Sequence, residues 1–153
     1  MTKKEVYTIE GVLEKNGRYI GPTVGVSMLP MLKNRRDTIV VARKTERLKP
    51  YDVALYKRGD VYILHRVLET IDGGYIIRGD NCYSDETVPE EAVIGVLVEF
   101  FRKNKHFLCT DKKYLSYVKK RLETYKIRRV FVLIKAKCKG AIKKMLRVIG
   151  LKK

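Results

Sequence analysis

A serine at a sharp bend is the first residue whose surroundings could support chemistry. Ser27 lies between Gly25 and Pro30 in the stretch GVSMLP. A glycine-bounded turn there would expose the Ser27 hydroxyl and leave nearby backbone N–H groups free to bind an oxyanion. A lone serine in a turn more often bonds to its own backbone. Ser27 is therefore a candidate nucleophile only if other residues support it.

Three motifs follow this serine in a characteristic order. After Ser27-Met28-Leu29-Pro30 come Tyr56, His65-Arg66-Val67 and Gly79-Asp80-Asn81, with 38 residues from Ser27 to His65 and 15 from His65 to Asp80. This series resembles the SMxP, HRV and GDN motifs of the signal peptidase and LexA-like serine peptidase superfamily. It is most similar to the histidine-using branch of the endoplasmic reticulum and archaea. The resemblance covers roughly residues 20–100 and implies a β-clip core of short antiparallel strands.

General chemistry assigns a role to each residue. A serine hydroxyl attacks a carbonyl effectively when an adjacent base removes its proton. His65 could accept that proton at neutral pH and return it to the leaving amine. The backbone N–H groups around Ser27 and Met28 are expected to hold the oxyanion. We therefore expect a serine endopeptidase that forms an acyl-enzyme and requires no metal or cofactor. Arg66 is expected to point to the opposite face of the strand and to support packing or an ion pair.

Three carboxylates compete to orient His65. The resemblance places the third catalytic residue a few positions after the GDN motif, which here means Asp85. Glu86 is an alternative because the spacing to Asp85 is slightly short. Asp80 lies inside the motif, but an aspartate between glycine and asparagine commonly stabilises a tight turn. We rank Asp85 first and Asp80 second.

Short strands are predicted to position these residues. From Tyr19 onward the pattern is β-like, and runs rich in β-branched residues alternate with turn signals. Turns at Arg58-Gly59-Asp60 and Asp72-Gly73-Gly74 predict two hairpins. Residues 5–14 favour a short helix that ends at Gly17, with a strand as the alternative. The predicted strands are Asp37–Arg43, Asp52–Lys57, Val61–Leu68, Tyr75–Arg78, Val93–Phe101 and His106–Cys109.

The hydrophobic period changes after Thr110. Apolar residues then recur at helical spacing, which predicts amphipathic helices with Lys and Arg on the other face. The two series are Leu115, Val118, Leu122, Tyr125 and Cys138, Ile142, Met145, Ile149. The expected fold is mainly β with an α appendage. Residues 1–110 would form the peptidase domain and residues 111–153 a basic helical tail.

The positive charge is concentrated in that tail. The net charge is +17, and residues 111–153 hold 16 Lys and Arg against two acids, whereas residues 1–110 hold 18 against 15. The tail could lie on an anionic membrane. Alternatively, residues 112–125 could pack their apolar stripe on the β core. Only residues 126–153 would then be expected to bind a membrane or a partner. Nucleic acid is disfavoured, because phosphate-binding surfaces usually add groups that read bases.

The remaining residues suggest a cytoplasmic protein that acts either in the cytosol or at the inner membrane surface. Its three cysteines, Cys82, Cys109 and Cys138, form no CxxC pair and are expected to be reduced thiols. Two histidines are too few for a convincing zinc site. No stretch approaches the roughly 18 apolar residues of a membrane-spanning helix. The first residues lack the apolar segment of a signal peptide.

Two alternatives to a peptidase that acts on other proteins remain open. The first is a non-catalytic module on the same fold that binds a peptide or a membrane surface. The second is a LexA-like regulator that cleaves itself, although the 26 residues before Ser27 are too few for a helix-turn-helix domain. In the leading hypothesis a peptide or precursor binds as an extended strand against a β edge.

Overall fold

A computed structural model describes residues 8–148 of the chain, with side chains up to residue 139 except that of residue 136. The chain divides into two units after Ser116. The first unit contains a β-sheet, a short N-terminal helix and the start of a second helix. The second unit is helical. The protein is thus mainly antiparallel β with three α-helices in the described residues.

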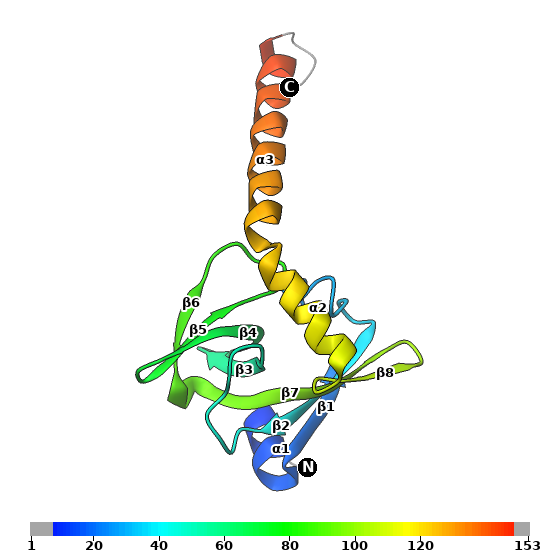
Figure 1. The fold of residues 1–153 in the computed structure, drawn as a ribbon, viewed down its shortest axis with the longest axis vertical. Helices are drawn as coiled ribbons and strands as arrows, with labels where there is room; N and C mark the ends of the chain where they lie inside the picture. Colours follow the sequence, from blue (N-terminus) through cyan, green and yellow to red (C-terminus); the bar gives the residue numbers. More distant parts are fainter. Residues whose placement is uncertain (1–7, 149–153) are drawn as a thin grey trace, which may run out of the picture. The chain divides into compact units, whose positions relative to one another are not determined.

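One antiparallel sheet dominates the first unit and curls into a half barrel (Figure 1). Its order is β1-β2-β7-β3-β4-β5-β6, and β8 pairs with β7. In residues 8–148 the strands are β1 (Arg18–Pro22), β2 (Asp37–Arg43), β3 (Val53–Arg58), β4 (Val61–Ile71), β5 (Gly74–Arg78), β6 (Glu86–Pro89), β7 (Val93–Arg102) and β8 (Lys105–Leu108). A single 3-10 turn, Glu90–Ala92, connects β6 to β7.

Side chains alternate between the core and the surface along β7, as in a pleated strand with one buried face. In β7, Val93, Gly95 and Leu97 are buried and the residues between them are half-buried. Inward-facing residues of several strands meet in an apolar cluster, and burial of such side chains favours folding. Its buried members are Leu48, Ala54, Tyr56, Val67, Tyr75, Ile77, Val88 and Val93.

The predicted strands are confirmed, with ends that shift by a few residues. Both predicted hairpins are present, since β3 pairs with β4 and β4 with β5. Gly59 and Gly73 have positive φ angles of 59° and 70° in these turns, which glycine adopts without strain. Strand β6 is not predicted from the sequence because it has four residues and buries only Val88.

The N-terminal helix is also confirmed. Helix α1 spans Ile9–Asn16 and begins after Thr8, whose hydroxyl accepts a hydrogen bond from the Gly11 N–H. Gly17 ends it in the left-handed conformation, and its N–H donates to the Leu13 carbonyl. Leu13 is the buried residue of this helix. The strand alternative is therefore wrong for these residues.

Two helices follow the sheet, as the change of period predicts. Helix α2 spans Lys112–Glu123, and α3 spans Tyr125–Val148. Within the first unit, the Tyr114 ring lies 6.1 Å from the Phe100 ring, so the first turn of α2 packs on β7. In the described part of the chain, no helix has the length and apolar character needed to cross a membrane. Ile149, predicted as a member of the second apolar series, lies outside the described residues.

Candidate active site

The segment between β1 and β2, which we call the serine loop (residues 23–36), presents Ser27. Gly25 adopts a φ of 94°, which favours glycine, and the Leu29–Pro30 peptide bond is cis. Ser27 itself is half-buried. The loop is anchored by buried apolar side chains that follow the serine, namely Met28, Met31 and Leu32. Ser27 is thus held on an anchored turn with its side chain accessible.

Hydrogen bonds close the base of the serine loop. The Thr23 hydroxyl and N–H both donate to the Asp37 carbonyl, at 2.9 and 2.8 Å. The Asn34 side-chain oxygen accepts from the Gly25 N–H at 3.0 Å. Within residues 8–148, the N–H groups of Ser27 and Met28 donate to no acceptor. Both N–H groups are therefore unpaired among the backbone hydrogen bonds of the described residues.

Strand β4 brings His65 to the serine loop. His65 pairs with Ala54 of β3 and is only 5% exposed. A point beside Gly79, where a Cβ atom would stand, lies 2.8 Å from the Ser27 carbonyl oxygen and 3.0 Å from His65 Cδ2. Because both groups lie within 3.0 Å of one point, Ser27 and His65 are neighbours across Gly79. Cδ2 lies between Cγ and Nε2 in the ring, so this edge of the imidazole faces Gly79.

The other ring nitrogen of His65 faces Tyr56 and Glu86. The Tyr56 hydroxyl lies 3.2 Å from His65 Nδ1 and donates to Glu86 Oε2 at 2.9 Å. Glu86 Oε1 lies 3.8 Å from Nδ1, and Arg58 Nη1 pairs with Oε2 at 2.9 Å. The carboxylate therefore lies close to His65, and the tyrosine hydroxyl bridges the two side chains.

This bridge determines which nitrogen of His65 carries the proton. A tyrosine hydroxyl has one hydrogen, and an ionised carboxylate only accepts. Since Tyr56 donates to Glu86, its oxygen must accept from His65, which places the hydrogen on Nδ1. Nε2 then carries a lone pair and no hydrogen. This is the tautomer that a general base requires.

Burial tunes the basicity of His65. Desolvation lowers the pKa of His65 below 6.5, and the nearby Glu86 carboxylate opposes this effect only in part. Burial also raises the pKa of the Tyr56 hydroxyl, and the hydrogen bond to Glu86 adds to this, so Tyr56 remains a neutral donor. His65 is consequently neutral at pH 7 and able to accept a proton.

The structure separates the three candidate acids. Asp85 is 49% exposed and pairs with Arg78 at 2.7 Å. Asp80 is buried and forms a two-pronged ion pair with Arg66, with both N–O distances 2.8 Å. Glu86 is the carboxylate that lies beside His65. The geometry thus favours Glu86, the sequence alternative, over the two residues ranked above it.

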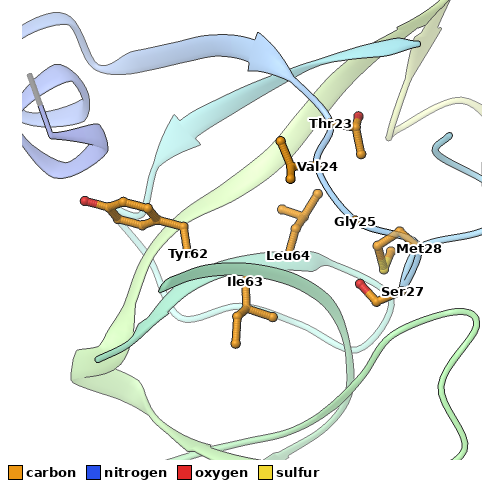
Figure 2. Close-up of a pocket in the computed structure, with 8 residues that line it drawn as sticks. All are labelled: Thr23, Val24, Gly25, Ser27, Met28, Tyr62, Ile63 and Leu64. Carbon is orange, nitrogen blue, oxygen red and sulfur yellow. The ribbon is translucent and has the colours of Figure 1, made fainter. Parts of the chain in front are cut away.

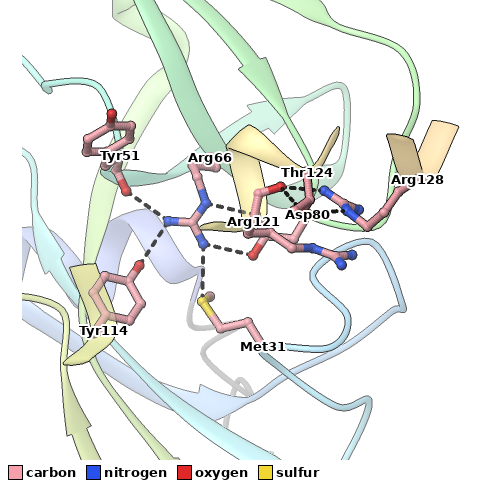
Figure 3. Close-up of polar contacts among 8 residues, drawn as sticks. All are labelled: Met31, Tyr51, Arg66, Asp80, Tyr114, Arg121, Thr124 and Arg128. Carbon is pink, nitrogen blue, oxygen red and sulfur yellow. Dashed lines mark hydrogen bonds and ion pairs between the residues drawn. The ribbon is translucent and has the colours of Figure 1, made fainter. Parts of the chain in front are cut away.

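Asp80 and Arg66 form a buried polar centre beneath the site (Figure 3). The remaining guanidinium donors of Arg66 reach the Tyr51 carbonyl at 2.9 Å, the Tyr114 hydroxyl at 3.0 Å and the Met31 sulfur at 3.2 Å. Burial alone would lower the pKa of Arg66, but its bonds to Asp80 outweigh burial and raise it. Arg66 therefore holds β4, the serine loop and α2 around one charge, which confirms its predicted role in an ion pair.

The GDN motif links this centre to the serine loop. Gly79 allows the close approach of Ser27 and His65, because a side chain there would overlap both. Asn81 donates its backbone N–H to the Ser27 carbonyl at 2.7 Å and its side-chain N–H to the Val26 carbonyl at 3.2 Å. The sequence identified these residues only as part of a motif. Their contacts with the serine loop could not be predicted, because they join segments far apart in the chain.

A shallow groove runs from Ser27 along β4 (Figure 2). A cavity of about 120 Å³ lies between the serine loop and β4, and the Ser27 hydroxyl points toward it. A second cavity of about 310 Å³ continues beside β1, and the two share lining residues. The shared residues are Thr23, Val24, Tyr62 and Leu64. The groove is largely apolar and open to solvent.

One contact expected of an active site is not formed. Between the described side chains, no hydrogen bond joins the Ser27 hydroxyl to His65. Catalytic hydrogen bonds are often long before substrate binds, so the neighbouring positions of the two residues are the relevant observation.

Comparison of the sequence with models of known protein families finds no match, and comparison with curated proteins finds none either.

Proposed function

We propose that the chain is a serine endopeptidase in which Ser27 is the nucleophile and His65 the general base. The observation that carries the proposal is the convergence of the Ser27 backbone and the His65 ring on Gly79. A tautomer with a free Nε2 lone pair and a depressed pKa supports the role of His65. Unoccupied N–H groups at Ser27 and Met28 support an oxyanion hole.

In the proposed reaction, His65 Nε2 removes the hydroxyl proton as Ser27 Oγ attacks the scissile carbonyl carbon. The carbonyl oxygen gains the negative charge and is bound by the Ser27 and Met28 N–H groups. The C–N bond then breaks, His65 donates its proton to the leaving amine, and an acyl-enzyme remains. Water, deprotonated by His65, hydrolyses the ester and restores Ser27.

Glu86 takes the place of the third catalytic residue in this proposal and acts through Tyr56. The imidazolium that forms during attack carries a positive charge beside the Glu86 carboxylate, 3.8 Å away. Tyr56 keeps the ring in one orientation and one tautomer. Glu86 and Tyr56 are therefore positioning residues, and neither touches the substrate.

The substrate is proposed to be an extended peptide segment with apolar side chains. Strand β4 pairs with β5 only from Arg66 onward, so in the described residues the stretch Val61–His65 has an unpaired edge that faces the groove. An added strand could bond to this edge, as in other peptide complexes. Two exposed apolar residues that line the groove, Val24 and Val61, favour apolar peptide side chains.

We further propose that the half-barrel sheet is the β-clip core of the signal peptidase and LexA-like superfamily. The support is that its SMxP, HRV and GDN motifs each contribute a contact to one site. We propose a cytoplasmic place of action, which the unpaired thiols of Cys82, Cys109 and Cys138 suit.

Labelling with a fluorophosphonate probe tests the proposal, because such probes react with activated serines. We expect the wild-type chain to be labelled at Ser27, as located by mass spectrometry of its peptides. Ser27→Ala should abolish labelling. Ser84→Ala is the matched control, since Ser84 is exposed and lies on the loop before β6, and it should label like the wild type. Equal labelling of the wild type and Ser27→Ala would overturn the assignment.

A non-catalytic peptide-binding module is the second candidate, favoured by the missing hydrogen bond between Ser27 and His65. Such a module would use the same groove but would leave the probe unreacted. A fluorescent peptide with apolar residues that binds wild type and Ser27→Ala equally, together with no acylation of either, would establish it.

A further inference from the structure

Helix α3 presents a continuous apolar face to solvent. Ile127, Val130, Phe131 and Ile134 follow the i, i+3, i+4, i+7 spacing of one helix face. These side chains are 60%, 54%, 67% and 52% exposed. Folded proteins rarely leave a continuous stripe of large apolar side chains in water unless it has a binding role. We call these four residues the apolar face.

Basic residues flank the apolar face and extend beyond it. At 100° per residue, Lys126 and Lys137 lie along one border and Lys135 along the other. The whole of α3 contains nine Lys and Arg residues and no acid. The guanidinium of Arg128 bonds back to the Arg121 carbonyl and the Thr124 hydroxyl of the same unit (Figure 3). The helix therefore combines exposed apolar area with a positive charge that nothing within α3 neutralises.

The combination of an apolar face and a high positive charge favours some binding partners of α3 over others. A second copy of α3 would bring nine positive charges against nine, without a carboxylate to pair with them. Nucleic acid would neutralise the charge but would leave the apolar face in water. The interface of an anionic bilayer satisfies both, because acyl chains accept the apolar side chains while lysines reach the headgroups.

We propose that α3 binds the surface of an anionic membrane and lies in the plane of the interface. The apolar face is inserted at the boundary between headgroups and acyl chains, and the flanking lysines contact acidic lipid headgroups. This binding goes beyond the peptidase proposal and does not depend on it.

A tryptophan scan can test the orientation directly, because the chain contains no tryptophan. Phe131→Trp places a reporter on the apolar face, and Val132→Trp, the matched control, places one on the other side of the helix. We expect the emission of Phe131→Trp to shift to shorter wavelength with vesicles of equal parts phosphatidylserine and phosphatidylcholine. The emission of Val132→Trp should not shift. Ile134→Trp, on the same face, should repeat the result if Phe131→Trp folds poorly.

Charge neutralisation tests the second half of the proposal. In the Phe131→Trp background, Lys126→Gln with Lys137→Gln should weaken vesicle partitioning about thirtyfold, since each lysine near the surface contributes about fivefold. Vesicles of phosphatidylcholine alone should give little binding.

Three results would overturn the proposal. Equal shifts for the 131 and 132 reporters would show that no face is inserted. A shift that grows with protein concentration in the absence of lipid would show self-association. Release from vesicles by a short RNA duplex, combined with tighter binding of that duplex, would show that the charge serves nucleic acid.

Discussion

Replacing Tyr56 with phenylalanine tests whether a hydroxyl determines the state of His65. The change removes one oxygen that is buried and bonded to His65 Nδ1 at 3.2 Å and to Glu86 at 2.9 Å. The ring would lose its hydrogen-bonded bridge to the Glu86 carboxylate, whose Oε1 lies 3.8 Å from Nδ1. A hydrogen bond that involves charged groups contributes about 1.5–3 kcal/mol. The rate of acylation should therefore fall by about tenfold to 150-fold.

The assay is the second-order rate constant of fluorophosphonate labelling, measured across pH. Labelling of the wild type should rise with pH through a midpoint below 6.5, because burial lowers the pKa of His65 and the neutral ring is the base. Tyr56→Phe should lower the plateau. Glu86→Gln should lower the plateau and also move the midpoint to still lower pH, because the carboxylate raises the pKa of His65.

Tyr75→Phe is the matched control for this experiment. Tyr75 is fully buried in the same sheet, and its hydroxyl accepts from the Leu48 N–H and donates to Glu90. The control loses the same atom at a comparable cost in stability, but it has no contact with His65. If Tyr56→Phe labels as fast as wild type, or if Tyr75→Phe slows labelling equally, the positioning role of Tyr56 is wrong.

Further substitutions separate the buried ion pair from the site. Asp80→Ala leaves the Arg66 charge buried, so urea unfolding should show a loss of about 3–5 kcal/mol. Asp85→Ala removes an exposed pair, so stability should change by less than about 1 kcal/mol and labelling should stay within about twofold of wild type. A hundredfold loss of labelling in Asp85→Ala would instead identify Asp85 as the acid that orients His65. Gly79→Ala forces a Cβ to 2.8 Å from the serine-loop carbonyl, so labelling should fall by about tenfold to a hundredfold while the chain still folds. The lowered pKa of His65 should also reduce stability as pH falls below 6.5, since the unfolded chain binds the proton first; His65→Gln should remove that slope in urea titrations at several pH values.

The sequence predicted the sheet well because its strands are local patterns. The hairpins at Gly59 and Gly73 follow from turn chemistry that involves adjacent residues. The closeness of Ser27 to His65 could be expected only from the resemblance between motif orders. No spacing rule indicates that residues 38 apart will meet.

The acid beside His65 could not be ranked from the sequence. Asp85 and Glu86 are adjacent, and the choice between them depends on where β6 begins. Glu86 is the first residue of β6 and pairs with Ile77, whereas Asp85 stays on the loop and meets Arg78. Because β6 has only four residues and one buried side chain, its start is set by pairing with β5 and not by a local pattern.

The adjacency of His65 and Arg66 has a consequence for when the site can exist. The His65 ring lies against Gly79, and the Arg66 guanidinium enters the buried centre with Asp80. Neighbouring residues of a strand point to opposite faces, so a one-residue slip of β4 would exchange the two side chains. The slipped chain would bury an imidazole against Asp80 and present a guanidinium to the serine. A nascent or misassembled chain would therefore lack the imidazole beside Gly79, so the proposed activity would require the complete sheet.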